Sequence, residues 1–130
     1  MNALTQIESN LIGSRQDIID LDSVVNAYPS AAVSVNEKGQ EIADLENLCS
    51  KVIAITDDGV GVNNLEILTK AMEIAKKYDV VMASHAEDSV NGKLPEGEYN
   101  AVIREIEFAK KIGCKYHFMH MSTKESFEAI

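Results

Sequence analysis

The sequence is poor in cysteine, with two thiols in 130 residues. Cys49 and Cys114 lie far apart in unlike surroundings, which fits a reducing cytoplasm better than a scaffold stapled by disulfides. Cys114 precedes His117 by three residues, but a single pair of this kind is a weak indication of a metal site. Such cysteines are more commonly small residues of the core, and we expect this for both.

Basic residues are also scarce. Twelve lysines and arginines stand against 21 aspartates and glutamates, giving a formal net charge of -9. This balance argues against a nucleic-acid partner, which needs clustered cations, and gives no attraction to an anionic membrane surface. No apolar run reaches the length of a transmembrane span, and no basic segment followed by an apolar one opens the sequence, so we expect a cytoplasmic protein without a signal peptide.

Two catalytic signatures are missing as well. No GxSxG elbow is present, which argues against a serine hydrolase of that type. The stretch "DDGVGV" contains GxG but lacks the third glycine of a dinucleotide-binding turn. The composition itself is ordinary, since 45% hydrophobic and 25% charged residues are typical of a globular protein. A chain of this length predicts one domain over residues 1–130.

What the sequence does contain is a regular alternation of strand-like and helix-like segments. Short apolar runs predict strands, and longer stretches with helical periodicity predict helices between them. Asn63 with Glu66 predicts a helix start, Gly113 a helix end, and "STKE" at 122–125 a further helix start. The expected strands span 31–35, 51–56, 80–85 and 115–121, and the expected helices span 15–26, 42–49, 63–78 and 98–112. Strands without internal alternation are typical of a parallel sheet buried on both faces, so the predicted class is α/β.

Chemically interesting residues follow three successive strands. Asp57 and Asp58 follow the second expected strand, His85 ends the third and His120 lies at the end of the fourth, whereas His117 faces the other side of its strand. Parallel strands bring their carboxyl ends to one edge, where sites of α/β proteins lie. Two imidazoles and one carboxylate suit catalytic Zn²⁺ or Fe²⁺, although each histidine alone is more often a hydrogen-bonded strand end.

Two acidic residues after His85 leave alternatives open. Glu87 and Asp88 could orient an imidazole from behind, as carboxylates do around metal ligands. Solvated loop charges or charges near a helix end are the commoner fate of such acids.

Three motifs, "AITDDGVGV", "ASHAED" and "HMSTKES", closely resemble in their order three motifs of the dihydroorotases, which belong to the amidohydrolase superfamily of metal-dependent cyclic amide hydrolases. The resemblance implies a (β/α)₈ barrel of TIM type, of which the chain supplies about half, and a centre of two zinc ions. It implies that Asp58 bridges the ions, that His85 and His120 bind the second one, and that Asp57 supports Asp58 from behind. "NALTQIES" is similar, more weakly, to a segment whose asparagine holds the substrate carboxylate, which maps to Asn2.

The sequence also departs from the family pattern. The HxHxR motif of the family's first strand has no counterpart, and the aspartate that acts as general base is expected beyond Ile130. We therefore assign no catalytic residue within the chain and expect the 130 residues alone to be inactive. The resemblance implies dihydroorotate as the substrate and N-carbamoyl-aspartate as the product, in pyrimidine biosynthesis.

Two other functions remain open at this stage. Dihydroorotase-like chains without active metal sites occur as structural partners of aspartate transcarbamoylase, and the open edges of half a barrel invite pairing and homo-oligomers. Retention of Asp58, His85 and His120 speaks against a purely structural role. The substrate could also be a hydantoin or allantoin ring, but those relatives typically use a carboxylated lysine in place of the aspartate.

Overall fold

The computed structural model describes residues 24–88 and 95–130. Strands and helices alternate along them, which confirms the predicted α/β class. No helix in these two stretches combines the length and apolarity needed to cross a membrane. In chain order the elements are β1 (Ser30–Ala31), the short 3₁₀ helix η1 (Val35–Glu37), α2 (Leu45–Leu48), β2 (Ala54–Ile55), α3 (Leu65–Tyr78), β3 (Val81–Ser84), α4 (Glu96–Ile112), β4 (Tyr116–Phe118) and α5 (Lys124–Ala129).

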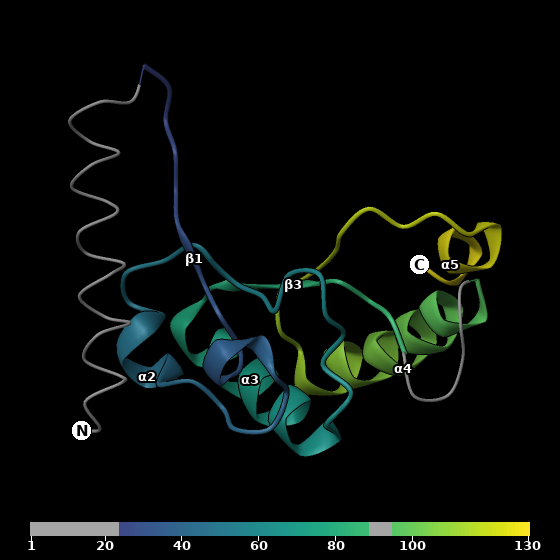
Figure 1. The fold of residues 1–130 in the computed structure, drawn as a ribbon, viewed down its shortest axis with the longest axis horizontal. Coiled ribbons are helices and arrows are strands. Elements are labelled where there is room, and N and C mark those ends of the chain that lie inside the picture. The colour runs from purple at the N-terminus through teal and green to yellow at the C-terminus, as the bar shows by residue number, and fades with distance from the viewer. Residues whose placement is uncertain (1–23, 89–94) are drawn as a thin grey trace.

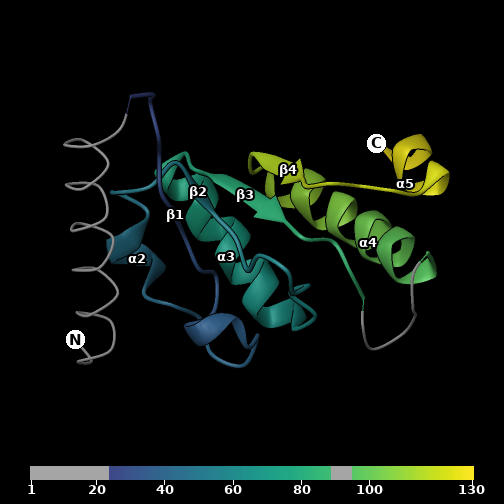
Figure 2. The ribbon, with the colours of Figure 1, turned by 45° about the horizontal axis from the view of Figure 1, so that its top comes forward.

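The four strands form one parallel sheet in the order β1-β2-β3-β4. Its register pairs Ala31 with Ile55, Ile55 with Met82, and Met82 with Tyr116. Because neighbours in the sheet are also neighbours in sequence, crossovers of one hand place successive helices on the same face. Figures 1 and 2 show α3 and α4 together on one side of the strands. This arrangement is consistent with part of a β/α barrel.

Helix α3 connects β2 to β3 and has well-formed ends. Its N-cap is Asn64, whose Oδ1 accepts hydrogen bonds from the backbone N–H groups of Glu66 and Ile67. The prediction of Asn63 as the cap was wrong by one residue, because Asn63 donates its side-chain amide to the carbonyl oxygen of Gly61. The helix ends at Tyr78, as predicted, and the next residue adopts the left-handed conformation that closes many helices.

The later helices follow the sequence signals closely. Helix α4 begins two residues before the predicted start and ends at Gly113, whose φ of 75° requires glycine-like freedom. Helix α5 is capped by Thr123, whose Oγ1 accepts from the backbone N–H of Ser126. The helix start predicted from "STKE" is displaced by one residue, because the N–H and hydroxyl of Ser122 both donate to Glu98.

The region before β2 differs most from prediction. The strand expected over 31–35 ends at Ala31, and the chain then turns through η1 and returns to pair Ile42 with Ser34 in an antiparallel bridge. Positive φ angles at Asn36 and Glu37 make that turn. The helix expected over 42–49 is limited to α2. The helix expected over 15–26 lies mostly outside the described residues, and its last three positions are not helical.

The larger core cluster lies between the sheet and α2 and α3. It includes the fully buried Ile55, Leu68 and Met72. Cys49 belongs to this cluster and Cys114 packs against it, and both are free thiols, which confirms the prediction of core cysteines. Burial raises the pKa of the Cys49 thiol to about 11, which makes it a poor candidate for a metal-binding thiolate.

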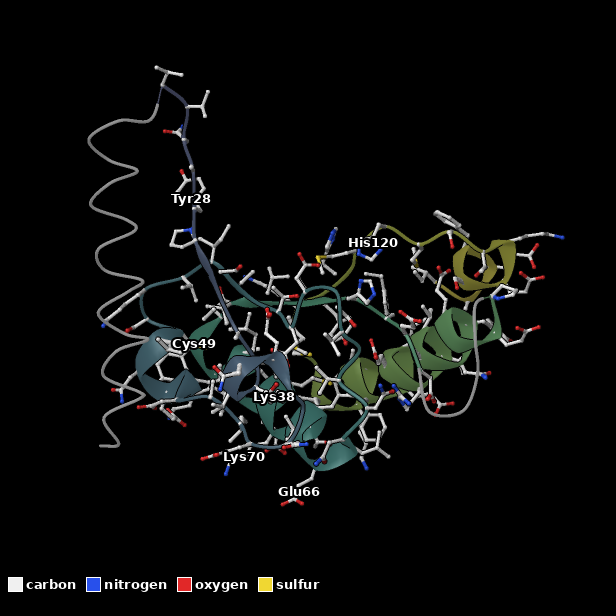
Figure 3. All side chains as sticks on the ribbon, viewed as in Figure 1. Tyr28, Lys38, Cys49, Glu66, Lys70 and His120 are labelled. Carbon is white, nitrogen blue, oxygen red and sulfur yellow. The ribbon has the colours of Figure 1, made fainter. Side chains whose placement is uncertain are left out.

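The extended segment that leads into β1 lies apart from this core. Figure 3 shows Tyr28 on that segment, and 64% of its surface is exposed. The same view labels His120, which lies on the loop between β4 and α5.

Candidate metal centre

Three side chains from three successive strand ends meet at the carboxyl edge of the sheet. Asp58 follows β2, His85 follows β3, and His120 lies two residues beyond β4. One ligand atom from each of them lies within 4.8 Å of the others. Parallel neighbouring strands produce this convergence, since their carboxyl ends share one edge. The spatial arrangement assumed for the predicted ligand set is therefore present.

The two histidines are in direct contact. Nδ1 of His85 lies 2.9 Å from Nε2 of His120, and the rings stand edge to face with centroids 4.6 Å apart. Two nitrogens bound to one tetrahedral zinc stand about 3.3 Å apart, as follows from zinc–nitrogen distances near 2.0 Å. A shift of the two rings apart by a few tenths of an ångström would bring the two nitrogens to that distance. Together with the carboxylate of Asp58, the donor set fits zinc.

The backbone of His120 has an unusual conformation. Its φ is 33°, on the left-handed side that non-glycine residues seldom adopt. Such a conformation costs about 1–2 kcal/mol and persists only where the surroundings impose it. It turns the chain sharply after β4, so that the imidazole approaches His85 instead of continuing the strand.

Glu87 holds the other side of the His85 ring. Its Oε2 lies 3.2 Å from Nε2 of His85, while Nδ1 of the same ring faces His120. A carboxylate behind a ligating imidazole fixes the ring orientation and leaves the opposite nitrogen free to bind. Of the alternatives open for Glu87 and Asp88, orientation of an imidazole fits Glu87. Asp88 forms an ion pair with Arg104 instead.

Asp57 turns away from the three ligand atoms. It is 3% exposed, and its Oδ1 accepts from the backbone N–H groups of Val33 and Ser34 at 2.7 and 3.0 Å. Its Oδ2 accepts a short hydrogen bond from the hydroxyl of Ser34. These bonds tie the end of β2 to the chain after β1. The contacts fix the backbone next to Asp58, a geometry compatible with the supporting role predicted for Asp57.

Gly61 brings the first two ligand-bearing segments into contact. A Cβ atom at this position would lie 1.9 Å from the carbonyl oxygen of Glu87. Only glycine permits this approach between the loop after Asp58 and the segment after His85. The sequence pattern assigned no such role to Gly61, because the contact depends on a neighbour 26 residues away.

A buried carboxylate anchors the loop after His120. Glu98, in the first turn of α4, is 6% exposed and accepts hydrogen bonds from the backbone and hydroxyl groups of Ser122 and Thr123, at 2.7 to 3.1 Å. Burial acts to raise the pKa of the Glu98 carboxyl, but hydrogen bonds from Ser122, Ser126 and Thr123 outweigh it and lower the pKa from 4.5 to about 2. Glu98 is thus an ionised clamp on the segment that carries His120.

A cavity of about 160 Å³ adjoins the two histidines. The apolar side chains of Ala86, Met119 and Met121 line much of it, and Glu98 contributes a polar wall. This volume holds several water molecules. Solvent or a small ligand therefore has space directly beside the imidazoles.

The remaining candidates do not join the centre. His117 is exposed on β4 and is not among the three residues whose ligand atoms converge. Cys114 packs against the core. Asn2 lies outside the described residues. Sequence reasoning missed Glu98, since nothing in a single sequence connects a glutamate in a first helical turn to hydroxyl groups 24 and 25 residues later.

Comparison with known proteins gives a consistent picture. A family model described as "Dihydro-orotase-like" matches residues 9–126. A dihydroorotase of Fusobacterium nucleatum is 31% identical, over 92% of this chain and 32% of the relative. A dihydroorotase of Elusimicrobium minutum is 34% identical over 93% and 32%, and one of Bacillus caldolyticus 32% identical over 82% and 29%. The chain spans about a third of the length of these relatives.

Proposed function

The chain belongs to the dihydro-orotase-like family, and from that membership we propose that it forms the central part of a zinc-dependent cyclic amide hydrolase. In this proposal residues 1–130 are one partial domain that contributes about half of a (β/α)₈ barrel. The four-stranded parallel sheet, with strands in chain order, supports that architecture.

The proposed reaction is the reversible hydrolysis of dihydroorotate to N-carbamoyl-aspartate, a step of pyrimidine biosynthesis. Water adds across the ring amide: the carbonyl carbon gains the hydroxyl, the ring nitrogen gains the hydrogen, and the bond between them breaks. Zinc, when bound, supplies a Lewis acid that polarises a carbonyl and makes water more acidic. The reverse reaction closes the ring and releases water.

The residues of this chain would hold and orient the centre. Asp58 would bridge the ions, while His85 and His120 would bind the second one. Glu87 would hold His85 in the tautomer that leaves Nδ1 free to bind, and Asp57 would fix the backbone beside Asp58. The shuttling of the proton is assigned to none of these residues.

The observation that carries the proposal is the convergence of three donor atoms from three strands within 4.8 Å. A purely structural partner of aspartate transcarbamoylase would not need this arrangement. The aspartate at 58 favours dihydroorotate over hydantoin or allantoin rings, whose hydrolases typically use a carboxylated lysine. A cytoplasmic location, assembly into homo-oligomers and an association with aspartate transcarbamoylase are further parts of the proposal.

The test is a chimera. Residues 26–130 replace the matching segment of the dihydroorotase of Fusobacterium nucleatum, and hydrolysis of dihydroorotate is followed by the loss of its ultraviolet absorbance. We expect turnover by the chimera, none by the chimera carrying His85→Gln, and unchanged turnover with His117→Gln, which alters an exposed histidine on β4. The 130-residue chain alone should show negligible turnover.

A folded chimera that binds zinc but does not hydrolyse dihydroorotate would refute the proposal, and so would robust hydrolysis by the chimera with His85→Gln. Hydantoin and allantoin serve as competing substrates, and preferential hydrolysis of either by the chimera would move the assignment to that class of ring.

A further inference from the structure

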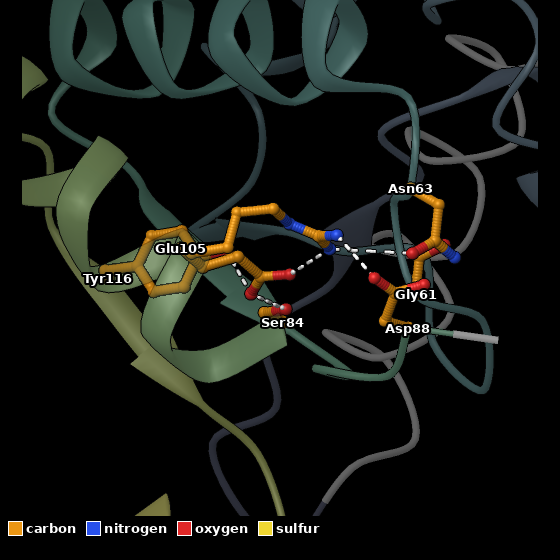
Figure 4. Close-up of polar contacts among 7 residues, drawn as sticks. Gly61, Asn63, Ser84, Asp88, Glu105 and Tyr116 are labelled. Atoms are coloured by element: carbon orange, nitrogen blue, oxygen red, sulfur yellow. Dashed lines mark hydrogen bonds and ion pairs between the residues drawn. The ribbon is translucent and has the colours of Figure 1, made fainter. Parts of the chain in front are cut away.

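Helix α4 carries an arginine, Arg104, whose guanidinium lies between two of the ligand-bearing segments. Its Nη1 donates to Oδ2 of Asp88 at 3.1 Å, and its Nη2 donates to Oδ1 of Asn63 at the longer distance of 3.5 Å. Asp88 follows His85 by three residues, and Asn63 follows Asp58 by five. Figure 4 labels Asn63 and Asp88 and marks these two hydrogen bonds with dashed lines.

The same two segments also touch directly beside this bridge. Asn63 donates its side-chain amide to the carbonyl oxygen of Gly61 at 3.2 Å. Gly61 in turn lies against the backbone of Glu87, with no room for a side chain. Arg104 is therefore linked through Asn63 to Gly61, in the loop after Asp58. Gly61 in turn touches the backbone of the segment after His85.

The neighbouring residue, Glu105, connects the remaining strands. It is fully buried, and its Oε2 accepts hydrogen bonds from the hydroxyl groups of Ser84 and Tyr116 at 2.6 and 2.8 Å. Ser84 immediately precedes His85 at the end of β3, and Tyr116 begins β4, the strand that leads to His120. Nη2 of Arg104 lies 3.5 Å from Oε1 of Glu105, so the two side chains pair (Figure 4).

A partly buried cation between two buried acidic side chains constrains its surroundings. The side chain of Arg104 is 20% exposed, and those of Asp88 and Glu105 are 5% and 0% exposed. Moving either segment would leave a buried acidic side chain without its cationic partner, which is strongly unfavourable. The exposed pair Lys115–Asp79, at 58% and 79%, carries no such constraint.

We propose that Arg104, paired with Glu105, is a positioning residue that fixes the loop of Asp58 relative to the segment of His85. The inference rests on the proposed function, since it concerns the same ligand set. Arg104 does not touch the three ligand atoms; it acts through Asn63 and Asp88. Its planar fork holds the two partners through two different nitrogens with fixed donor directions, whereas a lysine offers one nitrogen on a flexible stem.

The experiment measures zinc affinity of the full chain by competition with a chromophoric chelator, and the visible absorption of the Co²⁺-loaded chain. Arg104→Lys keeps the charge and loses the fork. We expect it to weaken zinc binding about tenfold or more, the usual effect of removing an outer contact, and to alter the Co²⁺ spectrum. Lys115→Met, which removes an exposed ion pair, is the matched control and should change neither quantity.

A second variant keeps the test independent of the folding of the first. Asp88→Asn leaves Arg104 in place and breaks the same bridge, so it should weaken zinc binding in the same direction. In the double variant the loss should be no larger than that of the more affected single variant, because both changes remove one contact.

Variants that remain folded by circular dichroism, yet bind zinc with wild-type affinity and give a wild-type Co²⁺ spectrum, would overturn the inference and leave the ligand set intact. Additive losses in the double variant would also overturn it. A wild-type chain that binds no zinc would overturn both this inference and the metal centre of the proposed function.

Discussion

His85 and His120 are 35 residues apart in the sequence, and their nitrogens Nδ1 and Nε2 lie 2.9 Å apart in the structure. Two neighbouring parallel strands, β3 and β4, bring them together, and the sharp turn at His120 completes the approach. Two imidazoles held edge to face beside a carboxylate form a donor set that suits a borderline-soft cation such as zinc.

The ligand set itself is the first target. Asp58→Asn, His85→Gln and His120→Gln should each weaken zinc binding by about 100-fold or more, since each removes a direct donor. Chelator competition measures the change. His117→Gln is the matched control, because it alters an exposed histidine only three positions before His120 that does not belong to the converging group. Equal losses for the variants at 117 and 120 would contradict the assignment.

The carboxylate behind His85 is the second target. Glu87→Gln keeps the size of the side chain and a hydrogen-bond acceptor but removes the charge, so zinc affinity should fall about tenfold. Glu125→Gln, on the exposed first turn of α5, changes the net charge equally and serves as the control. If both variants lower the affinity to the same extent, the effect comes from net charge and not from the contact with His85.

Gly61 gives a prediction about packing. Gly61→Ala places a methyl group 1.9 Å from the carbonyl oxygen of Glu87, so one of the two segments must move. We expect a loss of roughly 2 kcal/mol or more in the free energy of unfolding, together with weaker zinc binding. Gly39→Ala meets open space and should cost only about 1 kcal/mol, from its positive φ, with zinc affinity unchanged. Urea denaturation and chelator competition measure the two effects.

Glu98 gives a prediction about pH. Its pKa in the folded chain, about 2, lies below the ordinary value of 4.5, so the ionised form stabilises the fold. This stabilisation is fully present above about pH 5 and is lost as the pH falls through 4.5 towards 2. Allowing for screening by water in the adjoining cavity, its size is on the order of 2 kcal/mol.

Urea denaturation at a series of pH values checks that contribution. Glu98→Gln should be less stable than the wild type at neutral pH, and the difference should shrink on acidification, because the glutamine has no charge to lose. Glu128→Gln, on exposed α5, provides the comparison for an acid in solvent. A difference between wild type and Glu98→Gln that stays constant with pH would show that the clamp acts without its charge.

Much of the fold was predictable because local chemistry determines it. The alternation of apolar runs and amphipathic stretches gave the parallel α/β class, and Gly113 marked the end of α4 correctly. The starts of α3 and α5 were each displaced by one residue, because the side chains of Asn63 and Ser122 are engaged by Arg104 and Glu98, 41 and 24 residues away, and Asn64 and Thr123 form the caps. Local patterns cannot show such competition.

The centre was predictable to the same degree. Residues at successive strand ends can be read from the sequence, and the structure brings Asp58, His85 and His120 together. The surrounding contacts could not be read, because the partners of Glu98 and Arg104 lie 16 to 41 residues away in the chain. Pairings of this kind depend on how α4 packs against the loops, which no periodicity encodes.

The backbone of His120 has a consequence for how the chain can change over time. Glycine or asparagine would adopt its left-handed conformation at lower cost, so replacing the histidine should relax the loop while removing a donor. At this position a residue that stabilises the fold and a residue that can donate to zinc are different residues. If zinc binds as proposed, the chain keeps a strained backbone at His120 together with the imidazole that the centre requires.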